Sequence, residues 1–283
     1  MLYLTIVSFI WAFSFVIIKG SLTGLDSNFV SFARLALSLL LFLPLMRLNG
    51  IRVRDRLLLV GIGGIQFGLM YVAYIATYQY LPAHVIVLLT TTTPIFVSAV
   101  NDIFSRRFHA VFLFSAVLAV LGGAVIRYPA QPLEVNLRGI ALLQFSNIAF
   151  AFGQVAYVWV MKTVGTASNV RVFGLLYAGA VLVAGTFSLV STDYDAIQFS
   201  GSQVLALAYL GLIASGLCFF LWNKGATKVN AGMLAIMNNL KIPLGIIASL
   251  IFLRESTDYL RLLAGCALMA AAVMVNARMR KAG

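Results

Sequence analysis

Long apolar runs recur along the whole of this 283-residue chain and constrain its fold more than any other feature. Each run is long enough to cross the ~30 Å hydrocarbon core of a bilayer as a helix, which takes about 20 residues. Hydrophobic residues make up 62% of the chain and charged residues only 10%, which excludes an ordinary soluble domain. The runs follow one another too closely to leave room for one. The sequence therefore predicts an all-α integral membrane protein.

The apolar runs predict ten transmembrane helices. The longest polar connections are 47–56, 128–137 and 191–201, and the second divides the chain into two halves of five helices. Because five is an odd number, the second half enters the membrane in the opposite orientation to the first. We therefore expect one transmembrane domain built from two inverted repeats, residues 1–130 and 131–283. The expected helices cover residues 2–20, 28–46, 57–80, 84–104, 109–127, 138–161, 170–190, 202–223, 231–253 and 260–277.

A similar pattern around a proline occurs in both halves. Pro94 lies in HVIVLLTTTTPIFV of the fourth expected helix, and Pro243 lies in MLAIMNNLKIPLGI of the ninth. Proline has no backbone N–H, so each residue removes a helical hydrogen bond and favours a kink that exposes carbonyl groups. We expect Pro94 and Pro243 to act as two related hinges for alternating access.

Basic residues lie mostly at the ends of the expected helices and contribute to a net charge of +12. This distribution fits membrane orientation better than nucleic-acid binding, so we expect no nucleic-acid partner. Twelve basic residues fall on the side of the N-terminus and five on the other, which predicts that both termini are cytoplasmic. The twelve are Arg47, Arg52, Arg54, Arg56, Arg106, Arg107, Lys162, Lys224, Lys228, Arg278, Arg280 and Lys281, and the five are Lys19, Arg127, Arg138, Arg254 and Arg261.

The most unusual polar cluster lies in the middle of residues 231–253, where Asn238, Asn239 and Lys241 interrupt an apolar run. A Lys near the centre of a transmembrane helix costs roughly 2.5–3.5 kcal/mol on insertion scales. Lys241 lies about 15 Å from both membrane interfaces, too far for easy snorkelling. Because such charges usually face a bundle interior or a water-filled cavity, we expect a substrate site here.

Further polar candidates come from the sixth and second expected helices. Gln144, Asn147 and Gln154 are spaced three and seven residues apart and share one helical stripe. We expect this stripe to face the cavity; the alternative is that the amides join helices by hydrogen bonds. Arg34 lies inside the second expected helix, where its guanidinium either binds substrate or reaches the interface.

Aromatic side chains offer surfaces on which a flat ring can stack. Trp11 and Phe15 lie in the first expected helix, and Tyr71 and Tyr74 lie in the third. We assign all four to the site, with core or lipid-facing packing as the alternative.

No motif for catalysis, metal binding or nucleotide binding is present. Cys218 and Cys266 lie in apolar runs without redox or metal-ligand spacing, and no histidine has a second ligand nearby. We therefore expect neither an enzyme nor a cofactor nor a bound metal, and transport that is facilitated or driven by a gradient. Asp102 has Arg106 four residues later, so we expect an ion pair between them, with proton coupling through Asp102 as the alternative.

These residues resemble the ten-helix, EamA-type members of the drug/metabolite transporter superfamily. The resemblance covers the whole chain and includes WAFSF at 11–15, Arg34, the two prolines and the sequence LRE at 253–255. A closer resemblance is to the bacterial biotin transporters within that superfamily. It is carried by TPIFVSAVNDIFSRR at 93–107, QFSNIAFAFG at 144–153, ASGLCFFLWNKGATKVNAG at 214–232 and AIMNNLKIP at 235–243.

The resemblance implies a monomeric transporter in the bacterial inner membrane that takes up biotin or a similar small carboxylate. Lys241 and Arg34 would pair with the carboxylate, and Asn238 and Asn239 would bind the ureido ring, because an amide both donates and accepts hydrogen bonds. Besides the lipid bilayer, this small molecule is the only partner that we expect. Two alternatives remain: an exporter of amino acids or hydrophobic drugs, and a lipid flippase or scramblase. A multi-cation exporter would need an intramembrane carboxylate, whereas this chain has Lys241.

Overall fold

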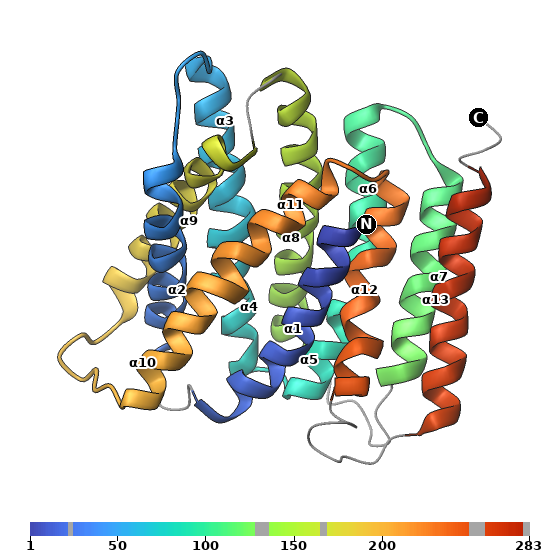
Figure 1. Ribbon diagram of the computed structural model, residues 1–283. Coiled ribbons are helices and arrows are strands. Elements are labelled where there is room, and N and C mark those ends of the chain that lie inside the picture. Colours follow the sequence, from blue (N-terminus) through green and yellow to red (C-terminus); the bar gives the residue numbers. More distant parts are fainter. Residues whose placement is uncertain (22–24, 128–135, 165–168, 249–257, 280–283) are drawn as a thin grey trace.

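The computed structural model describes residues 1–21, 25–127, 136–164, 169–248 and 258–279 (Figure 1). These residues form helices and connecting turns, and no strand occurs among them. The expectation of an all-α protein is confirmed. The helices lie side by side as a bundle (Figure 1).

Seven helical stretches in the described residues are long and apolar enough to cross a membrane. Two shorter apolar helices lie within Leu2–Ala12 and Ala110–Ile126, and the division into ten spans stays a prediction. The seven are Ser27–Leu45, Val53–Gln79, Val85–Ser105, Leu137–Val164, Asn169–Ser191, Gly201–Ala226 and Tyr259–Arg278. The helices that run without a break in type are α1 (Leu2–Ser21), α2 (Ser27–Phe42), α7 (Ala110–Arg127), α8 (Leu137–Val164), α9 (Asn169–Ser191), α12 (Ala231–Ala248) and α13 (Tyr259–Met279).

Two spans change helix type midway. The first consists of α3 (Val53–Gly63), the π-helical segment η2 (Gly64–Leu69) and α4 (Met70–Ala76), and the second of α10 (Gly201–Ala208), the π-helical η4 (Tyr209–Leu217) and α11 (Cys218–Ala226). A π-helical turn breaks the regular hydrogen-bond ladder and often occurs at functional sites. In η4 the backbone carbonyls of Ser215 and Gly216 both accept from the Tyr177 hydroxyl, at 2.9 and 2.6 Å.

The two prolines occupy different local structures. Helix α5 (Ala83–Thr90) ends before Pro94, and α6 (Thr93–Ser105) begins with this proline in its first turn. A missing N–H is tolerated there, because the first turn has no helical acceptors for its N–H groups. Pro243 lies inside α12, which continues on both sides of it.

Close backbone contact positions α3 and η2 against α9. A Cβ added to Gly63 would lie 1.9 Å from the Leu176 carbonyl oxygen, and one added to Gly179 would lie 1.9 Å from the Val60 oxygen. No larger residue fits either place, so these glycines allow the helices to approach closely, as small residues do in membrane bundles.

Asp102 has a different partner from the one we expected. Its carboxylate accepts from the backbone N–H of His109 at 3.2 Å and lies 2.6 Å from the His109 Nδ1. Arg106 ends α6 in the left-handed region at φ 51°, so the helical row that would place it beside Asp102 is interrupted. The expected Asp102–Arg106 pair was wrong.

Candidate functional site

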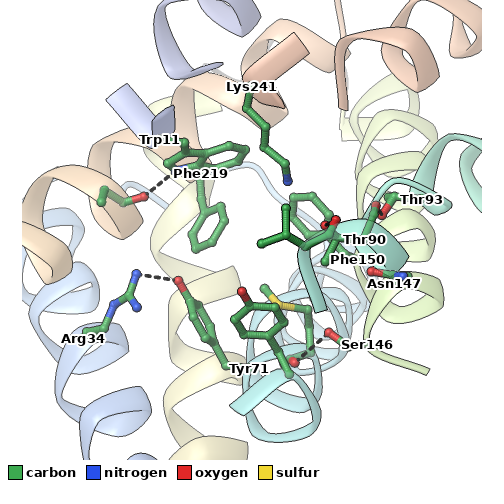
Figure 2. Close-up of a pocket in the computed structure, with 14 residues that line it drawn as sticks. Trp11, Arg34, Tyr71, Thr90, Thr93, Ser146, Asn147, Phe150, Phe219 and Lys241 are labelled. Carbon is green, nitrogen blue, oxygen red and sulfur yellow. Dashed lines mark hydrogen bonds between the residues drawn. The ribbon is translucent and has the colours of Figure 1, made fainter. Parts of the chain in front are cut away.

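A cavity lies in the middle of the bundle, where side chains from both halves of the chain converge (Figure 2). Its lining is mostly apolar and aromatic, with a small number of polar groups, as is usual for small-molecule sites. The lining residues are Trp11, Arg34, Met70, Tyr71, Tyr74, Val87, Thr90, Thr93, Ser146, Asn147, Phe150, Ala214, Phe219 and Lys241.

Lys241 extends from α12 toward the centre of the cavity (Figure 2). Its Nζ lies 5.8 Å from the centroid of the Trp11 ring, a distance at which a cation is attracted to an aromatic face. No hydrogen bond joins this ammonium group to any residue in the described ranges. All three of its N–H donors are therefore available to a ligand.

The Trp11 ring lies beside Lys241, and its indole N–H is already hydrogen-bonded within the protein. The indole N–H donates to the Ala214 carbonyl at 2.8 Å, which joins α1 to η4. The ring lies 5.0 Å from Trp222 and 5.5 Å from Phe219, centroid to centroid. Trp11 therefore presents a fixed apolar surface to the cavity.

Arg34 is a second cation at the cavity, and only 9% of the residue is exposed. Its Nη2 donates to the Tyr71 hydroxyl at 2.7 Å and to Ser215 at 3.0 Å, and its Nε donates to Ser215 at 3.3 Å. The guanidinium carbon also lies 4.8 Å from the Tyr71 ring centroid. Neutral hydroxyls and an aromatic face hold this charge in place, and none of them neutralises it.

Asn147 fastens α8 to the end of α5. Its Nδ2 donates to the Leu89 carbonyl at 3.0 Å, to Gln144 at 3.2 Å and to Thr92 at 3.3 Å. Thr92 also donates to the Gln144 side chain at 2.9 Å. Gln144 thus accepts a hydrogen bond from Asn147 and does not itself line the cavity.

The adjacent amides of α12 also lie outside the cavity lining. Asn238 is 2% exposed and donates to Gln154 at 3.1 Å and to the Leu234 carbonyl at 2.9 Å. Asn239 donates to the carbonyls of Thr91 and Ala119 at 2.9 and 3.0 Å. In this conformation both amides join helices.

The remaining candidates from the sequence are Tyr74, Pro94 and Phe15, and of the two whose side chains the structure describes only Tyr74 is a lining residue of the cavity. Tyr74 lines the cavity, and its hydroxyl lies 3.0 Å from that of Tyr78. Pro94 directly follows the lining residue Thr93. The side chain of Phe15 lies outside the described residues.

Sequence reasoning missed eight lining residues, among them the two threonines that flank the break between α5 and α6. Four consecutive threonines, 90–93, stand in an otherwise apolar segment, and that run was a usable signal. Ser146 lies between two candidates that we did name, Gln144 and Asn147. The other five are aliphatic or aromatic and carry no signal in the sequence: Met70, Val87, Phe150, Ala214 and Phe219.

The cavity is electrically positive. It is lined by Arg34 and Lys241, and no carboxylate occurs among its lining residues. The carboxylates in the described part of the chain all lie at helix ends or in connections: Asp26, Asp55, Asp102, Asp193, Asp195 and Asp258. A buried positive charge is costly unless it is paired, so the arrangement favours an anionic ligand.

Buried amides form a second polar layer next to the cavity. The side chains of Gln66 and Asn223 exchange two hydrogen bonds of 2.9 Å, and both residues are fully buried. Gln154 accepts from the Trp222 indole at 2.9 Å as well as from Asn238. These bonds connect η2, α8, α11 and α12, so they hold the bundle together beyond the cavity.

Apolar helices around a central cavity with two cationic side chains define a multi-pass membrane protein with a site for a small molecule. The chain matches the EamA-like transporter family over residues 1–128 and 137–277, and it belongs to this family. The resemblance that we drew from the sequence is confirmed.

Relatives of known description match almost the whole chain. A "Probable biotin transporter" of Pseudomonas aeruginosa is 38% identical, over 98% of this chain and 97% of its own. A "Biotin transporter" of Escherichia coli is 35% identical, and one of Salmonella typhimurium is 34% identical, each over 98% of this chain and 92% of its own. A solved structure described only as "Crystal structure of protein" superposes with a TM-score of 0.77 at 14% identity, over 98% of this chain and 96% of that one. The last likeness shows the fold alone.

Proposed function

We propose that this protein takes up biotin, or a closely similar small carboxylate, across the bacterial inner membrane by alternating access. The observation that carries the proposal is the positive cavity: Lys241 and Arg34 both line it, and no carboxylate among the lining residues balances them. The relatives named as biotin transporters support the same substrate.

The chemistry of the lining fits biotin in three ways. The free ammonium of Lys241 would bind the carboxylate by charge-assisted hydrogen bonds. The rings of Trp11, Phe150 and Phe219 would pack on the apolar bicycle. The polar side chains of α5, α6 and α8 would face the ureido ring.

We also propose the ten-helix architecture with two inverted repeats. The two stretches that match the family model fall on either side of the connection at 128–137. Packing supports the symmetry, because α2 packs against η4 as α9 packs against η2, and α1 packs against α12 as α8 packs against α6. In each pair of contacts, every helix of the first contact is replaced in the second by its expected counterpart from the other half. The π-helical segments η2 and η4 also fall in counterpart helices.

Alternating access requires that the cavity be closed toward one side of the membrane. Gln154 follows Asn147 by seven residues on α8, which places it about 10 Å farther along the helix. Asn223 follows Phe219 by four residues on α11. The amide layer therefore lies beyond the cavity in the direction in which both helices run.

That direction leads to the side that we expect to be cytoplasmic. Lys162 and Lys224 lie at the same ends of α8 and α11, and basic residues collect on the cytoplasmic side. We therefore propose that this conformation is closed toward the cytoplasm and accepts substrate from outside. The break before Pro94 and the proline in α12, Pro243, would be the hinges for the opposite state.

Binding of radiolabelled biotin to purified protein tests the proposal. We expect saturable binding, and we expect Lys241→Ala to weaken it by at least about 30-fold, since the substrate carboxylate would lose its buried partner. Lys162→Ala, at the exposed end of α8, is the matched control and should bind as the wild type does. A well-folded wild type that ignores biotin but is stabilised by aromatic amino acids or a lipophilic cation would contradict the proposal and favour an exporter.

A further inference from the structure

We infer that the α5–α6–α8 side of the cavity is a wall of hydrogen-bond acceptors, and that it selects carboxylates that also carry N–H donors. Four residues form this acceptor wall: Thr90, Thr93, Ser146 and Asn147. The inference rests on the proposed function for the carboxylate and adds what the rest of the substrate must offer.

Asn147 has its amide orientation fixed by its neighbours. Its Nδ2 faces the Leu89 carbonyl at 3.0 Å, and a backbone carbonyl can only accept, so nitrogen and not oxygen must occupy that side. Further acceptors from Gln144 and Thr92 lie within 3.3 Å of the same nitrogen. The Oδ1 therefore points the other way, and no hydrogen bond joins it to a described residue.

The three hydroxyls of the acceptor wall also donate to the backbone. Thr90 donates to the Val87 carbonyl at 2.7 Å, and Thr93 donates to the Thr90 carbonyl at 2.8 Å. Ser146 donates to the Met70 carbonyl on α4 at 3.0 Å. A hydroxyl has one hydrogen and two lone pairs, so each oxygen that is already donating keeps only acceptor capacity for a ligand.

The cationic groups of the cavity have the opposite character. Lys241 and Arg34 carry only donors, and Arg34 lies across the cavity from Thr90, Thr93 and Asn147 in Figure 2. Arg34 also has its Nε and Nη2 occupied by Tyr71 and Ser215. Lys241 is therefore the freer group for a carboxylate.

This division of donors and acceptors defines a substrate class. A ligand must present an anionic acceptor to the cations and N–H donors to the acceptor wall, as the ureido ring of biotin does. A carboxylate of similar shape without N–H groups would leave the acceptors of the wall unpaired, and sites built around a hydrogen bond reject analogues that lack it.

Paired ligands test the acceptor wall. Purified full-length protein is titrated with biotin and with an analogue whose two ureido N–H groups are replaced by ring oxygens; desthiobiotin, which keeps both N–H groups, is the ligand control. We expect the wild type to prefer biotin over the oxygen analogue by at least about tenfold. Desthiobiotin should bind nearly as well as biotin.

Two variants assign that preference to the wall. Asn147→Leu removes the Oδ1 acceptor in a similar volume and should lower biotin affinity about tenfold while leaving the oxygen analogue nearly unchanged. Should this variant misfold, Thr93→Val removes one acceptor with less disturbance, since the Thr93 hydroxyl bonds only within its own chain segment. A folded variant that keeps the full preference, or that loses affinity for both ligands equally, would overturn the inference.

Failure of the proposed substrate is distinguishable from failure of the wall. If the wild type does not bind biotin, the same comparison is made with N-acetyl amino acids and their N-methylated forms, which differ by one N–H. If the protein prefers the N–H form of these ligands, biotin is wrong as the substrate but the inference about the acceptor wall stands. No preference in either pair would refute the wall.

Discussion

Arg34 shows how a single residue can hold a charge in an apolar bundle without a carboxylate partner in the described part of the chain. Its guanidinium is fixed by Tyr71 and Ser215 and lies over the Tyr71 ring. Hydrogen bonds to a charged group are stronger than those between neutral groups, and low local dielectric strengthens them further. The charge remains available to attract an anion because its neighbours are neutral.

We predict that Tyr71→Phe weakens binding of biotin roughly tenfold, because the variant keeps the ring but removes the hydroxyl that accepts from Arg34. Equilibrium binding to the purified variant measures the effect. Tyr78→Phe is the matched control, since it deletes a hydroxyl whose partner is the Tyr74 hydroxyl and not Arg34. The affinity of this variant for biotin should stay at the wild-type value. Equal losses in the two variants would contradict a positioning role for Tyr71.

Residue-level reasoning from the sequence went furthest where the free-energy cost of placing a side chain in the membrane identified a residue. A cation in mid-span needs a special environment, so Lys241 was expected at a cavity, and it lines one. Arg34, for which the membrane interface was the alternative, and Trp11, which we assigned as a stacking surface, line the same cavity. An amide in mid-span has two good solutions, a ligand or a neighbouring carbonyl. Asn239 bonds to Thr91 and so joins helices here, and only the packing of α12 against its neighbours decides between the two.

At the scale of elements, the helices of the described residues were predictable from the apolar runs, and the π-helical interruptions were not. Apolar runs define where a span begins and ends to within a few residues. The π-helical segments η2 and η4 leave no such signal, yet they shift the register of α4 and α11. Register decides which side chains face the cavity, so Phe219 was missed.

We predict that Gly179→Ala destabilises the protein by at least about 2 kcal/mol, because the added methyl would overlap the Val60 carbonyl and neither backbone can yield cheaply. A lowered thermal unfolding temperature in detergent measures it. Gly61→Ala on α3 is the control, since no atom lies within 4 Å of its added Cβ. It should be neutral or slightly stabilising, given the higher helix propensity of Ala. Similar stability of the two variants would show that α3 and α9 do not rely on this close approach.

For the whole molecule, the proposed transport cycle requires a contact that closes one end of the bundle and can open again. The Gln66–Asn223 pair joins η2 of one half to α11 of the other through two hydrogen bonds in a fully buried site. Such a pair stabilises the closed end only while both members are present, since a lone buried amide costs more than it contributes. The pair is therefore suited to a contact that forms and breaks during transport.

We predict that Gln66→Leu and Asn223→Leu each shift the protein away from this conformation, whereas the double variant returns toward it, because two apolar side chains leave no unpaired amide. The readout is labelling of Tyr74→Cys by a membrane-impermeant thiol reagent added from outside, in a chain in which Cys218 and Cys266 are replaced by Ala. Tyr74 lines the cavity, so its labelling reports opening to that side. Each single variant should be labelled more slowly than the parent, and the double variant should recover part of the rate. If the single variants unfold at lower temperature but keep the parental labelling rate, the pair serves the stability of the fold and not the transition between states.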